Sequence, residues 1–169
     1  MKQFKTLLFA AVLFIGATSL TVAQSKIAHI NTADLVQAMP EMKSAQAEIE
    51  TLSKTYDAEL KSMMTEFQNK MKQYQAEADT KTEEENIKRA QEVETMKASI
   101  QQFQGQAQQD LQTKNDALMK PIFEKAKAAI SRVAKAQGFQ YVLDSTQGSG
   151  VLVSDGKDLL ADVKTELGF

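Results

Sequence analysis

The sequence predicts an α+β fold in which a long antiparallel helical hairpin is inserted into a small strand-containing body. The two prolines of the chain, Pro40 and Pro121, enclose a stretch with a single glycine, Gly105. A stretch without these two residue types is either helical or disordered. Its apolar residues recur at helical spacing, but they are too few for a globular domain. Short runs of β-forming residues lie outside the prolines, near both ends of the chain.

Residues 1–23 have the pattern of a secretory signal peptide. Lys2 and Lys5 precede a short apolar run at residues 7–15, and Ala23 supplies the small residue expected at a cleavage site. A membrane anchor is the alternative, but the run is short for a helix that spans a bilayer. The chain has no cysteine, so we expect neither disulfides nor a lipid-bearing cysteine. We therefore expect an exported mature chain.

The first elements of the mature chain are predicted to be a strand and a short helix. Residues 26–30 form a β-prone run, and Asn31 can cap a helix over residues 33–39. Pro40 fits the first turn of the following helix, where its missing N–H costs nothing. Glu41 suits the positive end of that helix dipole.

Two helices of similar length are predicted between the prolines. Apolar residues recur every three or four positions over residues 42–78 and again over residues 87–111, with Leu118 seven residues further on. After Tyr56 most steps are four, nearer an eleven-residue than a seven-residue repeat, which predicts little left-handed supercoiling. Residues 82–85, Thr-Glu-Glu-Glu, match a capping box. A helix start there favours two antiparallel helices joined at residues 80–82 over a single continuous rod.

The segment after Pro121 is predicted to return to the body. The helix should bend at Pro121 and end near Gly138, a glycine well placed for a left-handed cap. The elements expected beyond it are a strand over residues 139–144, a hairpin turn at Gly148-Ser149-Gly150, a strand over residues 151–153, and a helix capped by Asp155 or Asp158 that ends near Leu167.

The sequence thus divides into a body, residues 24–40 and 121–169, and an arm, residues 41–120. A body of this size has a marginal core on its own, and its strand edges would otherwise lie open. We therefore expect the chain to oligomerise through its strands. The candidate interface residues are Ile27, Ile30, Val142, Val151 and Val153.

The sequence offers no candidate for catalysis, a cofactor or a metal site. His29 is the single histidine, and neither a nucleophile elbow nor metal-ligand spacing accompanies it. The glycines near residue 149 lack the lysine of a phosphate loop. Residues 41–120 carry 15 acidic and 11 basic side chains, and the body carries seven of each. Without a basic excess, nucleic-acid binding is not expected.

The arm is notable for its methionines, which suit surfaces that meet many different partners. The alternative is that they only fill the seam between the two helices, although the adjacent Met63 and Met64 cannot both do so. Because this seam is thin, we expect local opening, fastest around residues 75–95. Gly105, in a glutamine-rich stretch, is either a point of bending or part of a solvated face. The candidate binding residues are Met63, Met64, Phe67, Met71, Met96 and Phe103.

The order of elements, together with KIAHIN at residues 26–31, VAKAQGF at 133–139, YVLD at 141–144 and DLLADV at 158–163, resembles the OmpH/Skp family of periplasmic chaperones. The resemblance implies a homotrimer with a small β-barrel-like body and three hairpin arms around a cavity. Unfolded outer-membrane β-barrel proteins would be held there without ATP. A periplasmic coiled-coil tether or adaptor is the alternative function.

The charge of the arm tip departs from the basic enterobacterial members of that family. Residues 77–89 contain five acidic and three basic side chains. Binding of lipopolysaccharide or of an anionic membrane is therefore not carried over to this chain. Electrostatic attraction to acidic partners should also be weaker.

Overall fold

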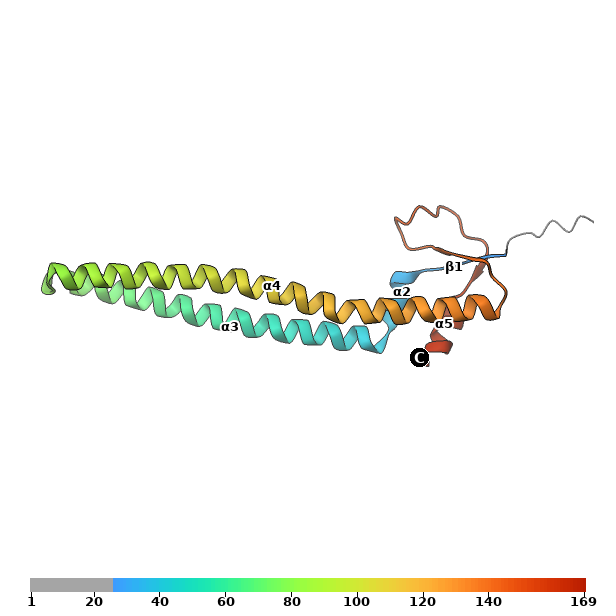
Figure 1. Ribbon diagram of the computed structural model, residues 1–169, viewed down its shortest axis with the longest axis horizontal. Coiled ribbons are helices and arrows are strands. Elements are labelled where there is room, and N and C mark those ends of the chain that lie inside the picture. Colours follow the sequence, from blue (N-terminus) through green and yellow to red (C-terminus); the bar gives the residue numbers. More distant parts are fainter. Residues whose placement is uncertain (1–25) are drawn as a thin grey trace, which may run out of the picture.

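The structure, a computed structural model, describes residues 26–169. A two-helix arm projects from a small body at one end (Figure 1). The predicted α+β class with an inserted helical hairpin is confirmed, although the sheet is not a closed barrel. The signal-peptide prediction for residues 1–23 lies outside the described residues. The elements are β1 (Ile27–Ile30), α2 (Thr32–Ala38), α3 (Pro40–Glu77), the 3-10 helix η1 (Ala78–Thr80), α4 (Glu83–Ala136), β2 (Tyr141–Asp144), β3 (Lys157–Asp158) and α5 (Leu160–Leu167).

The arm is the antiparallel pair formed by α3 and the first part of α4, and its turn carries the predicted capping box. The Glu85 amide donates to Thr82 Oγ1 at 3.3 Å, and the Thr82 amide donates to Glu85 Oε2 at 3.0 Å. With 38 residues, α3 is about 57 Å long. Because α4 runs back alongside α3 (Figure 1), the alternative of a single continuous rod is wrong.

Helix α4 continues through Pro121 into the body, as the sequence predicted. The helix ends in a Schellman motif: the Gly138 amide donates to Lys135 O at 3.1 Å and the Phe139 amide donates to Ala134 O at 2.9 Å. Gly138 has a φ of 73°, the left-handed conformation expected at this position. The cap turns the chain back toward β2.

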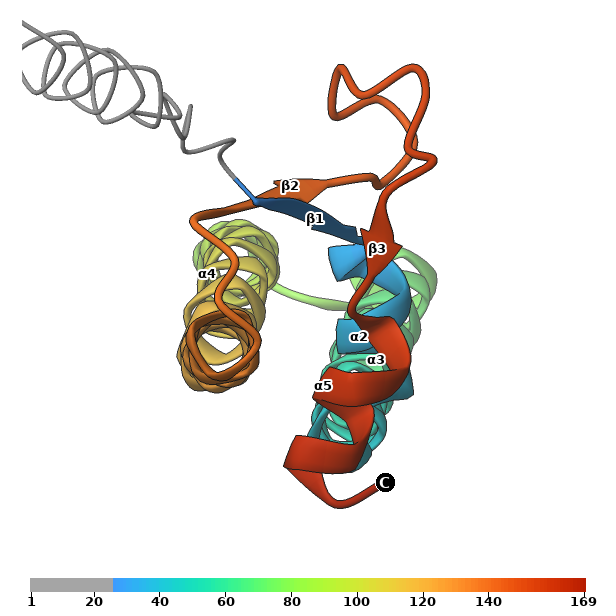
Figure 2. The same ribbon diagram turned by 90° about the vertical axis from the view of Figure 1, so that its right-hand side faces the viewer.

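The sheet is parallel, with β1 between β2 and β3. Ile27 lies opposite Tyr141, and Ile30 lies opposite Asp144. Parallel neighbours need a long crossover, and between β1 and β2 that crossover contains the entire arm. Figure 2 shows the helices below one face of the sheet, with α4 at the left and α2 and α5 at the right.

The prediction of a strand at residues 151–153 is wrong. These residues have no regular secondary structure, and β3 forms at residues 157–158 instead. Leu152 and Val153 are strongly exposed, so their β-forming side chains have no core to cover. The predicted hairpin turn at Gly148-Ser149-Gly150 is also wrong. The strands on either side of this loop, β2 and β3, both pair with β1 and not with each other.

The hydrophobic core lies in the body and joins segments from both ends of the chain. Fully burying one large apolar side chain contributes roughly 1.5–3 kcal/mol, so a few such residues account for most of the packing energy. In the described arm, by contrast, only Ala45 of α3 and Ala107 of α4 are buried. The largest fully buried side chains are Ile30, Leu35, Met39, Leu159 and Val163.

The seam of the outer arm follows a seven-residue spacing, so the prediction of an eleven-residue spacing is wrong there. Lys70 is half-buried at the seam where the sequence pattern placed Met71, and Glu77 is half-buried beside Ala78. Alternating steps of four and three residues are the spacing of left-handed coiled coils. The half-buried residues of outer α3 that face the seam are Leu60, Met63, Phe67, Lys70, Tyr74 and Glu77.

Candidate functional site

The residues predicted to bind partners on the arm fall into two groups. Met64 and Met71 are 44% and 45% exposed. Of the adjacent pair at 63 and 64, one faces the seam and the other faces solvent, as the sequence required. The seam therefore explains some of these residues, and the remainder form accessible surface. The half-buried ones are Met63, Phe67, Met96 and Phe103.

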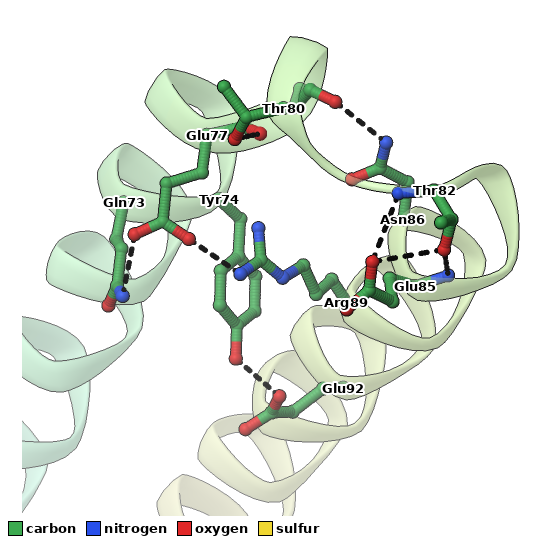
Figure 3. A network of polar contacts seen from close by, with 10 residues as sticks. Gln73, Tyr74, Glu77, Thr80, Thr82, Glu85, Asn86, Arg89 and Glu92 are labelled. Atoms are coloured by element: carbon green, nitrogen blue, oxygen red, sulfur yellow. Dashed lines mark hydrogen bonds and ion pairs between the residues drawn. The ribbon is translucent and has the colours of Figure 1, made fainter.

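A polar network holds the two helices together near the tip of the arm (Figure 3). Tyr74 Oη donates to Glu92 Oε2 at 2.5 Å, and the Arg89 guanidinium donates to Glu77 at 2.5 Å. Arg89 also lies 4.6 Å from the centroid of the Tyr74 ring, at cation–π distance. Glu92 forms a second contact, an ion pair with Lys70. We call this set the tip clasp.

The tip clasp favours the charged forms of Lys70, Glu77 and Glu92. Hydrogen bonds from Lys70 and then from Tyr74 lower the pKa of the Glu92 carboxyl. Hydrogen bonds from Gln73 and then from Arg89 lower the pKa of Glu77. At neutral pH these carboxylates are ionised, so the clasp is closed.

The structure offers a reason to revise the expectation of fast opening at residues 75–95. In addition to the clasp, the Asn86 side-chain amide donates to Ala78 O at 2.9 Å across the turn. Lys88 and Arg89 are paired with Glu84 and Glu77. The tip is therefore held together by several contacts between its residues. Residues 77–89 carry five acidic and three basic side chains, so the tip has a net negative charge.

The seam changes character below the tip clasp. The Tyr56 and Phe103 rings pack edge to face with centroids 5.9 Å apart, and Tyr56 Oη donates to Asp110 at 3.1 Å. Between Tyr56 and Lys70, α3 makes no hydrogen bond or ion pair to α4 among the described residues. This mid-arm span is about 21 Å long. Its half-buried side chains are Leu60, Met63 and Phe67 on α3 and Val93, Met96 and Ile100 on α4.

A second exposed apolar surface lies on the outer face of the sheet. Side chains alternate between the two faces of a strand, and Ala28 is buried on the inner face. Ile27, Tyr141 and Leu143 therefore face outward, and they are 50%, 61% and 46% exposed. The pairing of β1 with β2 brings them together on one face. Sequence reasoning missed Tyr141 and Leu143, although the alternation within YVLD could have identified them.

The five candidate interface residues are not all on this outer face. Ile30 is buried and Val142 packs against the same core, so both side chains serve the body of their own chain. Val151 is half-buried and Val153 is exposed, both in the loop between β2 and β3. Ile27 alone among the five lies on the outer face of the sheet.

His29 has a structural environment. Its Nδ1 lies 3.3 Å from Ser145 Oγ and its Nε2 lies 3.2 Å from Gly156 O, so the ring connects both ends of the loop between β2 and β3. Within residues 26–169 no three His, Asp or Glu side chains are grouped as metal ligands would be. None of the helices in this range has the length and apolar character needed to cross a membrane.

Comparisons with known proteins agree with this architecture. Residues 26–167 match the family model described as outer membrane protein (OmpH-like). Chaperone protein Skp of Pectobacterium atrosepticum is 27% identical over 154 residues, covering 89% of this chain and 90% of that protein. The crystal structure of an OmpH-like protein from Caulobacter crescentus superposes with a TM-score of 0.75 at 17% identity, covering 85% and 83% of the two chains. The resemblance seen in the sequence is confirmed, and the chain belongs to the OmpH-like outer membrane protein family.

Proposed function

We propose that this protein is an ATP-independent holdase chaperone of the periplasm. It would bind unfolded outer-membrane β-barrel proteins, its clients, in a cavity between the arms of a homotrimer and prevent their aggregation. The observation that carries this proposal is the arm itself. It extends about 57 Å, its buried residues are Ala45 and Ala107 among those described, and it carries apolar side chains in a thin, half-buried seam and on its outside. The relationship to a chaperone from Pectobacterium atrosepticum supports it.

In this proposal the arm, residues 41–120, binds the client. Many apolar contacts of about 1 kcal/mol or less would each be weak, yet together they would retain a mobile chain. The exposed Met64 and Met71 are suited to such contacts because methionine is flexible and polarizable. The acidic tip argues against lipopolysaccharide or anionic membrane as an additional partner.

The test is aggregation of an unfolded outer-membrane β-barrel protein diluted from urea, followed by light scattering without nucleotide. We expect the wild-type protein to suppress scattering. About 0.5 M salt should weaken this suppression only slightly, because screening acts on charges and not on apolar contacts. Scattering that is unchanged by the protein would favour the alternative, a tether with one fixed partner. Loss of suppression in salt would replace the apolar account with an electrostatic one.

We further propose that residues 24–40 and 121–169 form the trimerisation body and that the outer face of the sheet belongs to the interface. The double variant Tyr141→Asp, Leu143→Asp tests this, because both side chains are exposed and their replacement spares the core. Light scattering coupled to gel filtration should show a trimer mass for the wild type and a smaller mass for the variant. Ile87→Asp, at an exposed arm position, is the matched control and should remain trimeric. A variant with the wild-type mass would place the interface elsewhere.

Export to the periplasm rests on the signal-peptide pattern of residues 1–23. Cell fractionation of the full chain, with mass spectrometry of the mature N-terminus, tests it. A cut after Ala23 is expected, and an uncleaved cytoplasmic product would contradict it.

A further inference from the structure

A cavity opens on one side of the seam within the mid-arm span and at its border with the tip clasp. Its volume is about 260 Å³. It lies far from the core of the body, since Met63 is 18 residues beyond Ala45, or about 27 Å along α3. The residues that form it include Met63, Glu66 and Lys70 of α3 and Met96, Ser99 and Ile100 of α4.

The walls of this cavity offer little to a water molecule. The hydroxyls of Thr95 and Ser99, which line it, donate to carbonyls of their own helix, at Gln91 O and Thr95 O. The Lys70 ammonium is engaged by Glu92. Because Glu66, Thr95 and Ser99 are exposed, the cavity is an open groove, and the donors of its two hydroxyls and of Lys70 are already engaged. The cavity is therefore better suited to an apolar occupant.

The volume of the cavity matches one side chain. An apolar cavity of about 150 Å³ is large enough to hold benzene, so about 260 Å³ accommodates an aromatic ring and its connection to a backbone. The same volume lies below the roughly 300–1,000 Å³ typical of sites for drug-sized ligands. Met63 and Met96 form part of the wall and can adapt to rings or branched chains of different shape.

The charge at the rim of the cavity affects which residues can flank the bound side chain in the sequence of the client. Glu66 makes no ion pair or side-chain hydrogen bond to any described residue, whereas Glu92 is neutralised by Lys70. The rim therefore carries one unbalanced negative charge, which disfavours acidic neighbours in an occupant and favours basic ones.

We propose that this cavity binds a single aromatic or large aliphatic side chain of an unfolded client, preferably one flanked by neutral or basic residues. This rests on the proposed holdase function and adds a defined side-chain site to it. The cavity is already open beside the Lys70–Glu92 ion pair, so a side chain can enter it without separating the two helices.

The first experiment uses the full mature protein labelled with ¹³C at its methionine methyl groups. The probe is a soluble peptide with one phenylalanine among glycine, serine and arginine, and the matched peptide has alanine in its place. We expect the methyl signals of Met63 and Met96 to shift with the phenylalanine peptide and not with the alanine peptide. Met39 and Met119, near the base of the arm, should stay unchanged. No shift at Met63 and Met96, or shifts confined to the exposed Met64 and Met71, would overturn the proposal.

The second experiment fills the cavity with Ser99→Leu. The matched control is Ser62→Leu, an exposed serine on α3 that does not line this cavity. We expect Ser99→Leu to weaken binding of the phenylalanine peptide at least about tenfold, and Ser62→Leu to leave it unchanged. Circular dichroism checks that both variants are folded. Should Ser99→Leu fold poorly, the methyl shifts in the wild-type protein still decide the question.

The outcomes separate this proposal from the proposed function. If the wild-type protein suppresses client aggregation but the peptide binds Ser99→Leu as it binds the wild type, the cavity assignment fails and the holdase function stands. If the wild-type protein does not suppress aggregation, the holdase function fails, whatever the peptide does. Shifts of Met63 and Met96 that appear without peptide when the protein concentration is raised would assign the cavity to contacts between arms and overturn the proposal.

Discussion

Asp144, the last residue of β2, accepts several hydrogen bonds that connect the sheet to the start of α2. Its carboxylate accepts from Thr32 Oγ1 at 2.6 Å and from the Thr146 amide and hydroxyl at 2.9 and 2.7 Å. Burial by itself would raise the pKa of this carboxyl. The hydrogen bonds from Thr32 and then from Thr146 outweigh burial, and they lower the pKa from its ordinary value of 3.8 to about 2. Protonating Asp144 should therefore destabilise the body.

The size of this effect follows from the shift. A pKa lowered from 3.8 to about 2 corresponds to roughly 2.4 kcal/mol at 1.36 kcal/mol per unit. Asp144 is exposed, so solvent screening reduces this figure, and we expect about 1 kcal/mol. Because the folded pKa is below the unfolded one, the stabilisation is complete above about pH 5. It is lost as the pH falls through 3.8 toward 2.

The measurement compares wild type with Asp144→Asn in denaturant unfolding followed by circular dichroism, from neutral pH down to about pH 2, at one protein concentration. The wild type should be more stable by about 1 kcal/mol at neutral pH, and the difference should approach zero near pH 2. Asp155→Asn is the matched charge control, because Asp155 makes no hydrogen bond or ion pair to a described residue through its carboxylate. A difference for Asp144→Asn that is constant across this range would refute the reasoning.

Four further outcomes are expected from the structure. Leu35→Ala, which empties a fully buried site, should lower the free energy of unfolding by about 2–5 kcal/mol in denaturant titration. Gly105→Ala should raise it by about 0.5–1 kcal/mol, because a Cβ there meets no atom within 4 Å. Thr82→Ala should cost about 1 kcal/mol and speed amide exchange in the first turn of α4. Amide exchange in the wild type should be faster at residues 60–67 than at residues 74–77, and the reverse order would contradict our assignment of the clasp.

The helices and their ends could be predicted because their signals are local. Asn31 caps α2 by accepting from the Asp34 amide at 3.0 Å. Thr82 and Gly138 mark the start and the end of α4. Each of these signals depends on residues within a few positions of one another, so a single sequence contains all the information needed.

The third strand could not be predicted because its partner is distant in the sequence. Residues 151–153 have strong β propensity, but this propensity reflects packing against neighbours more than an intrinsic backbone preference. Lys157 and Asp158 have weak propensity and still form β3, because they lie beside β1. The Leu159 amide donates to His29 O at 2.9 Å, directly after that strand. Which segment pairs with β1 is decided by the folded body, and a single sequence does not contain that pairing.

The seam residues of the outer arm were misassigned for a related reason. The apolar pattern favoured Met71, whereas the structure places Lys70 at the seam and leaves Met71 exposed. Lys70 is favoured there because Glu92 on the facing helix pairs with it. Complementary charges on two helices become informative only when the alignment of the two helices is known, and this alignment was not available from the sequence.

The distribution of contacts along the seam bears on how a holdase could work without ATP. Ion pairs and hydrogen bonds near the tip, and the Tyr56 contacts below the mid-arm span, are directional, so they fix how the two helices are aligned. Apolar contacts in between have no preferred direction. A client side chain that enters the cavity exchanges contact with water for apolar contact with the seam, and each such exchange is small on its own. Binding of each side chain is then weak and reversible. Retention would come from many such exchanges at once, and release would need no energy source beyond the folding of the client elsewhere.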